Sequence, residues 1–245
     1  MFVLTIDQQG SRVVGDRVDG LLAAFASAPL TAAGAPGFVR PFERTVGDEV
    51  QAVLDDADVV VDLALTVLRR GGWTVGIGAG PVDEPLPPTS RAGSGDAFVA
   101  ARVAVERAKS RVRAVPLAVE GADRASAADA EAVLTLVAAV GERRTAAGWE
   151  VIDALRAPGV PGRVGGRQQD VAHRLGVSQQ AVSQRLRTAL WAEELAARPL
   201  AARLLIAAGT RPGDPSGAGH GESEQGGRQH DPVVETTQVE RKVET

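Results

Sequence analysis

Side chains that can hydrogen-bond to DNA bases are concentrated in one short stretch of the last third of the sequence. Glutamine and serine both donate and accept hydrogen bonds, and arginine binds guanine and phosphate, so these residue types suit base edges in a major groove. No acidic residue lies between positions 179 and 187. The candidate DNA-contacting residues are Ser178, Gln179, Gln180, Ser183, Gln184 and Arg187.

Two short helices joined by a tight turn must hold these side chains in place. Gly176 stands where the chain has to pass through a left-handed conformation, and Ser178 is a favourable N-cap for the second helix. The apolar side chains expected to pack the two helices together are Val171, Ala172, Leu175, Val182 and Leu186. This layout predicts a helix-turn-helix with its polar face turned outward.

The charge of this region also favours a phosphate backbone as the partner. Between positions 162 and 198 six arginines oppose three acidic residues, a local net charge of +3, whereas the whole chain carries −4. The segment resembles the helix-turn-helix of sigma-factor region 4 and related bacterial regulators. Two alternatives stay open, an ordinary helical hairpin with a glycine between its helices and a module that contacts protein instead of DNA.

Composition excludes several classes of protein. The chain has 245 residues, 44% of them hydrophobic and only 3% aromatic, so it has room for one large or two small domains with a core of Val, Leu and Ala. The absence of cysteine excludes disulfides, thiolate metal sites and a cysteine nucleophile. The first residues turn polar too soon for a signal peptide, and no apolar run reaches membrane-spanning length. We therefore expect a cytoplasmic protein.

Alternating patterns predict an α+β fold for the first half of the chain. Strand, helix, strand, strand, helix, strand is the ferredoxin-like order, a sheet with helices on one face. A hairpin tip falls at 46–48, and Ser126 is the expected cap of the last helix of this part. The expected strands are 2–6, 37–44, 49–54, 73–80 and 114–119, and the expected helices are 16–28, 56–69, 95–109 and 126–143.

The second half divides into helices, a break and a polar tail. A helical connection at 149–155 precedes the Pro- and Gly-rich linker 157–162, and a last helix is expected at 200–208 after Arg198 and Pro199. The remainder is rich in Gly, Ser, Gln and charge, which predicts disorder. The expected parts are a ferredoxin-like domain at 1–123, connecting helices at 124–157, a helix-turn-helix domain at 162–208 and a disordered tail at 209–245.

Three segments of the first half, 45–50, 75–82 and 97–102, resemble class III nucleotide cyclases in order and spacing. Those enzymes have a ferredoxin-like core. The segments 7–12 and 16–17, together with the Gly-Asp-Glu hairpin at 47–49, are closer to the SatD family of bacterial proteins, and this resemblance extends to the helix-turn-helix. The family brings an expected fold and no assigned activity.

The cyclase resemblance implies a nucleotide site. Asp7 and Asp48 match the two carboxylates that hold Mg²⁺ against a triphosphate, with Glu49 nearby, and Arg102 matches the arginine that stabilises the transferred phosphoryl group. The sequence departs from the pattern at other positions. Phe98 replaces the asparagine that orients the ribose, and the purine-selecting lysine and its acidic partner fall at Arg44 and Arg91.

Several interpretations of Asp7, Asp48 and Arg102 therefore stay open. In the first interpretation, these residues bind a nucleotide or metal without turnover, as in a sensor. In the second, they serve another phosphoryl-transfer reaction. In a third, structural interpretation the two aspartates pair with Arg12, Arg17 or Arg44 at the strand ends, since Gly-Asp is common at hairpin tips.

Two further features, the alternating glycines at 76–80 and His173, have structural explanations that involve no ligand. Gly76, Gly78 and Gly80 alternate along a strand instead of opening a helix, which predicts close backbone packing against a helix or at a dimer interface rather than a dinucleotide site. His173 is expected on the outer side of its helix, facing solvent or phosphate.

These patterns together predict a DNA-binding transcriptional regulator whose first domain dimerises or senses a ligand. A homodimer is expected because one helix-turn-helix binds DNA weakly and because cyclase-like domains pair through their sheet faces. The alternative from another class is an enzyme, a divergent nucleotide cyclase or related phosphoryl-transfer catalyst built on Asp7 and Asp48.

Overall fold

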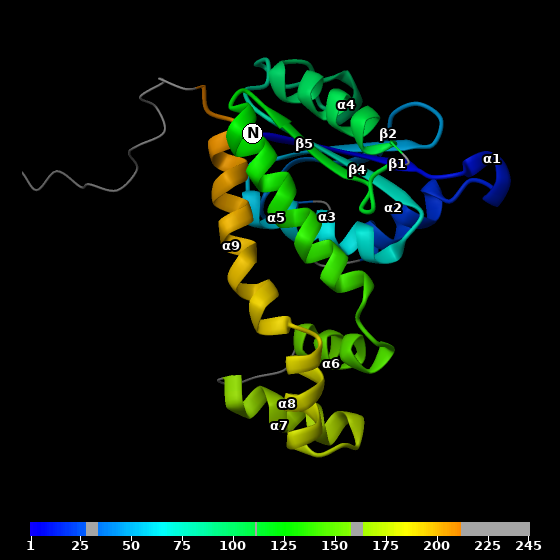
Figure 1. Cartoon of the computed structure of the whole chain (residues 1–245). Coiled ribbons are helices and arrows are strands. Elements are labelled where there is room, and N and C mark those ends of the chain that lie inside the picture. The colour runs from blue at the N-terminus through cyan, green and yellow to red at the C-terminus, as the bar shows by residue number, and fades with distance from the viewer. Residues whose placement is uncertain (28–33, 111, 158–163, 212–245) are drawn as a thin grey trace, which may run out of the picture. The chain divides into compact units, whose positions relative to one another are not determined.

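Five β-strands form one mixed sheet in this computed structural model (Figure 1). The strands are β1 (Phe2–Gln8), β2 (Phe38–Arg44), β3 (Glu49–Leu54), β4 (Trp73–Ala79) and β5 (Leu117–Gly121). Their order across the sheet is β2-β3-β1-β4-β5. The central strand β1 is antiparallel to both β3 and β4, and β5 is parallel to β4.

The structure describes residues 1–27, 34–110, 112–157 and 164–211, all within one compact unit, Met1–Asp214. Within these residues, helices separate and follow the strands, which confirms the α+β class. Expected strands and helices before residue 143 are present with ends displaced by a few residues. The α-helices are α1 (Ser11–Val14), α2 (Val18–Ser27), α3 (Ala57–Arg70), α4 (Asp96–Ala108), α5 (Arg124–Glu142), α6 (Ala146–Arg156), α7 (Val164–Leu175), α8 (Gln179–Thr188) and α9 (Trp191–Ala208).

Helices cover both faces of the sheet, so the expectation of helices on one face is wrong for the sheet as a whole. Leu4, Ile6 and Ile77 point into a large core with α2, α3, α5 and α9. The opposite face carries Val3 and Val53, which pack with Ala97 and Ala101 of α4 and with the loop before it. Figure 1 shows α4 on this face of the sheet. The chain's own residues thus cover both faces of the central strand β1, and pairing of two copies through the sheet faces stays a prediction.

Glycines in β4 let α4 approach the sheet backbone closely, as the alternating glycines predict. A Cβ added at Gly76 would overlap the backbone of Val105, and one at Gly78 would overlap the backbones of Ala97 and Ala101. At Gly80 it would make only ordinary contact. The Ala-rich face of α4 completes this tight layer, because Ala97 and Ala101 are fully buried.

The N-cap of α5 is Asp123 and not the expected Ser126. The Asp123 carboxylate accepts hydrogen bonds from the backbone N–H groups of Ala125 (2.9 Å) and Ser126 (3.4 Å), and from the Ser126 hydroxyl (2.7 Å). These bonds, first among them that of the Ser126 hydroxyl, lower the pKa of Asp123. An acceptor immediately before a helix satisfies backbone N–H groups of the first turn that a serine at the third helical position has no means to reach.

A second, smaller core lies among α6, α7, α8 and the start of α9. Its buried side chains are Val151, Ile152, Ala154, Val171, Ala172, Val182, Leu186, Ala189 and Trp191. The packing thus assigns α6 to the helical unit and α5 to the sheet, although both fall in the expected connecting segment 124–157. The second half of α9 belongs to the large core through Ala201, Ala202 and Leu205.

Helix α9 begins at Trp191 and continues through Pro199, so the expected break before residue 200 is wrong. A proline inside a helix removes one hydrogen bond and costs about 3 kcal/mol. Contacts on both sides of it compensate: Trp191 is buried in the small core, Leu205 in the large one, and Arg198 pairs with Glu194 one turn earlier. Among the described residues, no helix combines the length and apolarity needed to cross a membrane.

Candidate nucleic-acid interface

The turn between α7 and α8 has the geometry that the sequence predicts. Gly176 adopts a left-handed conformation with φ of 63°, and the following Val177 N–H donates to the Ala172 carbonyl at 3.0 Å. Ser178 caps α8, its hydroxyl accepting a hydrogen bond from the Ala181 N–H at 3.1 Å. A side chain at position 176 would be strained, so the turn depends on glycine.

The apolar residues expected between the two helices support them from beneath. Val171 and Ala172 of α7 and Val182 and Leu186 of α8 are buried in the small core, and Leu175 is half-buried against it. Because α6 supplies Val151 and Ile152 to the same core, α7 and α8 rest on a third helix.

The polar face of α8 is turned to solvent. Gln179, Gln180, Gln184 and Arg187 are all exposed, and Ser178 is exposed at the start of the helix. Arg187 donates a hydrogen bond to the Gln184 side chain at 2.6 Å, so these two side chains hold each other in place. Amide and guanidinium groups therefore line one accessible face that a duplex could approach.

Ser183 lies between the two helices and not on the open face. It is half-buried, and its hydroxyl donates a hydrogen bond to Gln168 of α7 at 2.8 Å. Its side chain is therefore already engaged in holding α7 against α8. The sequence placed it outward because its helical position adjoins Gln184 and Arg187, but the crossing of α7 covers this edge.

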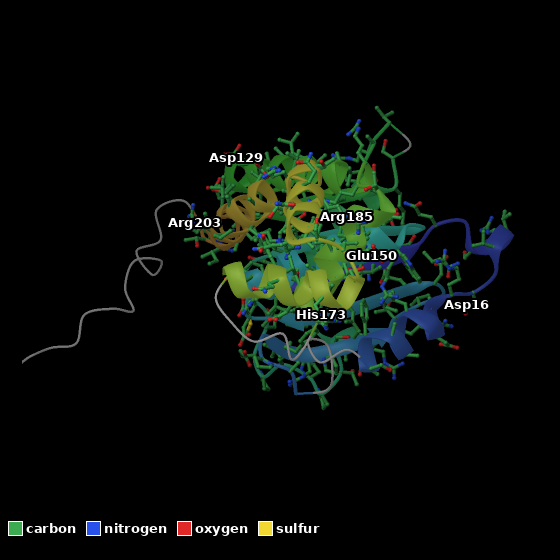
Figure 2. The ribbon with its side chains drawn as sticks, turned by 90° about the horizontal axis from the view of Figure 1, so that it is seen from below. Asp16, Asp129, Glu150, His173, Arg185 and Arg203 are labelled. Atoms are coloured by element: carbon green, nitrogen blue, oxygen red, sulfur yellow. The ribbon has the colours of Figure 1, made fainter. Side chains whose placement is uncertain are left out.

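The other polar residues of the helical unit flank the exposed face. Arg185 forms an ion pair with Glu150 of α6 at 3.1 Å, and both are labelled in Figure 2. His173 is exposed on α7, as expected. Arg174 donates weakly to the carbonyl of Ala154 at 3.4 Å. Arg185 is thus a structural cation, which leaves Arg187 as the exposed cation of α8.

A buried arginine in the loop after α5 joins that loop to the helical unit and α9, a feature that no sequence pattern indicated. The Arg144 side chain is 1% exposed, and its Nη2 lies 2.5 Å from Oε2 of Glu194, which is 4% exposed. Its Nε donates to the Ala189 carbonyl at 2.7 Å, while the guanidinium lies 4.8 Å from the Trp149 ring centre. Loop, α6 and α9 thus meet around one cation.

Further ion pairs extend this joint to α3. Asp62 of α3 accepts from both Arg156 of α6 and Arg198 of α9. Arg69, also of α3, pairs with Asp153 at 2.5 Å and stacks on Trp149 at 3.7 Å. A cavity of about 320 Å³ lies beside these groups. Only the Glu194–Arg198 spacing of four residues was visible in the sequence, because the other partners are far apart in the chain.

The carboxylates of the implied nucleotide site gather at one end of the sheet. In the register of the sheet, Asp7 of β1 lies directly opposite Glu49 of β3. The Gln8 N–H donates a hydrogen bond to the Asp48 carbonyl at 3.1 Å. Asp7 forms an ion pair with Lys109 at 3.1 Å. Burial raises the pKa of Asp7, and the negative charges of Asp48 and Glu49 add to this, against the opposing effect of Lys109.

Arg102 is not part of this group. Ala101 packs on Gly78, which pairs with Val3, whereas Lys109 reaches Asp7 at the other end of β1. Lys109 follows Arg102 by seven positions, a distance of about 10 Å along the helix axis. The cation beside Asp7 is therefore Lys109. Its place at the end of an expected helix was the sequence feature that could have indicated this role.

Other members of the implied site have structural partners instead. Arg44 hydrogen-bonds Asp16 through both carboxylate oxygens, at 2.8 and 2.7 Å. Phe98 packs beside Val3 and Val53 on the α4 face of the sheet, and Arg91 is exposed. In the described part of the chain, no cluster of three His, Cys, Asp or Glu side chains is arranged to hold a metal ion.

Comparison with protein-family models, with curated proteins and with solved structures finds no significant match to this chain.

Proposed function

We propose that this chain is a cytoplasmic DNA-binding protein, in the class of transcriptional regulators, and that α8 enters the major groove. One observation carries the proposal. The inner side chains of α8 are buried against α6 and α7, whereas Gln179, Gln180, Gln184 and Arg187 are exposed on one face. A supported helix with a free face of amides and a guanidinium is what base recognition requires.

The charge of α8 favours this proposal over an ordinary helical hairpin. A helix turned to solvent in an acidic protein commonly carries Glu and Asp, but α8 contains none. Its basic residues fall in the last turn, where Arg185 and Arg187 lie. Arg185 is neutralised by Glu150, so Arg187 is the residue of α8 that we expect to contact phosphate or guanine.

The sheet domain is proposed to be ferredoxin-like, and related to cyclase-like and SatD proteins. The order β2-β3-β1-β4, with antiparallel neighbours throughout, supports this, because two β-α-β units interleave in that way. Crossover helices α2 and α3 both contribute to the large core on one face. In this proposal the domain carries and positions the helical unit.

The test measures binding of a labelled random-sequence duplex to the full chain by fluorescence anisotropy at several salt concentrations. We expect the affinity to fall steeply with salt, and Arg187→Ala to weaken binding and reduce the slope by about one counterion. Arg124→Ala, an exposed arginine of α5, is the matched control and should bind like the wild type. No salt-dependent binding by the wild type would contradict the proposal.

A further inference from the structure

The outward face of α9 is apolar except for Arg203 and, at its edge, Glu193. The opposite face is buried, with Trp191 in the small core and Ala201 and Leu205 in the large one. A surface helix usually presents charged side chains to water, and a helix that is apolar on all sides is usually covered on all sides. The exposed residues of α9 that form this outward stripe are Ala192, Leu195, Ala196, Pro199, Leu200, Arg203 and Ile206, with Glu193 at its edge.

The large side chains of the stripe are strongly exposed. Leu195 is 49% exposed, Leu200 41% and Ile206 57%, and they recur over three turns of one helix. By contrast, Val99 and Val103 of α4 form a pair confined to a single turn. Repeated apolar exposure at this spacing marks a contact surface more strongly than scattered residues do.

The two charges on this surface are arranged to complement a second copy of the same helix. Glu193 stands near the start of α9 and Arg203 near its end, and neither joins an ion pair within the described part of the chain. When two copies of α9 lie antiparallel about a two-fold axis level with Arg198, Glu193 of each copy comes level with Arg203 of the other. A two-fold contact requires this kind of self-complementarity.

We propose that the outward stripe of α9 is a dimerisation surface and that its partner is a second copy of this chain, packed antiparallel. In the same register Ala196 of each copy lies level with Leu200 of the other, so a small residue faces a large one. Ala192, Ala196 and Pro199 let the two helices approach closely, while Leu195 and Ile206 become covered. This contact involves α9 alone and needs no rearrangement of the helices that cover the described sheet.

The arrangement also separates the two helical units. Because α8 leads directly into the first turn of α9, antiparallel pairing places the two units at opposite ends of a helix of 18 residues. That helix is about 27 Å long. Paired helix-turn-helix proteins bind half-sites about one turn of DNA apart, roughly 34 Å, so the spacing is of the required order.

The test is the oligomeric state of the full chain without DNA, measured by sedimentation equilibrium over a range of concentrations. We expect a dimer whose dissociation constant rises about tenfold or more in Glu193→Arg and in Arg203→Glu, because each places like charges together. The double variant Glu193→Arg/Arg203→Glu should restore the dimer. Leu195→Glu should dissociate it, and Val99→Glu on α4 should not.

A monomer at all concentrations would overturn the proposal, and so would a dimer that Leu195→Glu leaves intact. Weakening in both single charge variants without restoration in the double variant would overturn the antiparallel register. Circular dichroism melting of each variant shows whether the fold is retained. Because no DNA is present, the outcome is independent of whether α8 binds a duplex.

Discussion

Arg144 and Glu194 form an ion pair that is almost completely removed from solvent, their side chains being 1% and 4% exposed. Transferring two charges from water is costly unless further interactions compensate both groups. Glu194 also accepts from Arg198 at 2.5 Å. Arg144 donates through Nε to the Ala189 carbonyl and lies against Trp149, but its buried Nη1 and Nη2 make no hydrogen bond within the described residues, so its attraction to Glu194 is purely ionic. The pair fixes the start of α9 to the loop before α6.

We predict that Arg144→Met destabilises the protein strongly because it leaves Glu194 buried with one cation instead of two. The expected loss in the free energy of unfolding is about 3 kcal/mol, measured by urea denaturation. The adjacent Arg143 is exposed, and Arg143→Met should change stability by less than about 0.5 kcal/mol. Equal effects of the two substitutions would contradict the role given to Arg144.

The contact between α4 and β4 predicts a second stability difference. Gly78→Ala should unfold the chain or lower its melting temperature sharply, because the new methyl group meets the backbone of Ala97 and Ala101. Gly20 of α2 has open space around its Cβ position, so Gly20→Ala should be neutral or stabilise by up to about 1 kcal/mol. Thermal melting followed by circular dichroism compares the two, and a harmless Gly78→Ala would show that α4 packs less closely.

Glu131 of α5 predicts the behaviour of the protein in acid. Burial alone raises the pKa of Glu131, but hydrogen bonds from Arg107, the Val119 N–H and Arg113 outweigh it and hold the pKa below its usual value of 4.5. The folded state therefore binds this proton less readily than the unfolded chain does. The stabilisation is complete above pH 4.5 and is lost as the pH falls through the lower, folded-state pKa.

Glu131→Gln should accordingly lower stability at neutral pH by about 1.5–3 kcal/mol and flatten the acid limb of the stability profile. Urea denaturation between about pH 6 and about pH 3 measures this limb. Glu142, exposed on the same helix, is the control, and Glu142→Gln should leave the profile as in the wild type. If stability still fell in acid in Glu131→Gln as it does in the wild type, the loss of stability would come from other carboxyl groups.

Local patterns predicted the parts of the structure that depend on neighbouring residues. The left-handed Gly176, the Ser178 cap and the crowded Gly76 and Gly78 follow from what each residue can do on its own backbone. Long-range packing decided the rest. Pro199 is tolerated inside α9 because distant partners hold both halves of the helix.

The candidate sites divide in the same way. Exposure of Gln179, Gln180, Gln184 and Arg187 follows from the helical period. The partial burial of Ser183, by contrast, depends on where α7 crosses. The resemblance to cyclases placed Arg102 beside Asp7, yet the register of α4 on β4 brings Lys109 there. Sequence order alone does not fix such a register.

Individual glutamines of α8 should govern sequence preference. Gln180→Ala and Gln184→Ala each remove an exposed amide, so each should relax the preference at one or two base pairs by about 1–3 kcal/mol while non-specific binding persists. Gln184→Ala should also loosen Arg187, which it holds at 2.6 Å. Gln169→Ala, an exposed glutamine of α7, is the control.

Selection of bound duplexes from a random pool by the full chain, followed by sequencing, tests the role of α8 most directly. The wild type should enrich a defined motif, and Gln180→Ala or Gln184→Ala should change that motif at specific positions, whereas Gln169→Ala should reproduce it. Enrichment of no motif by the wild type, or of the same motif by all four proteins, would contradict base recognition by α8.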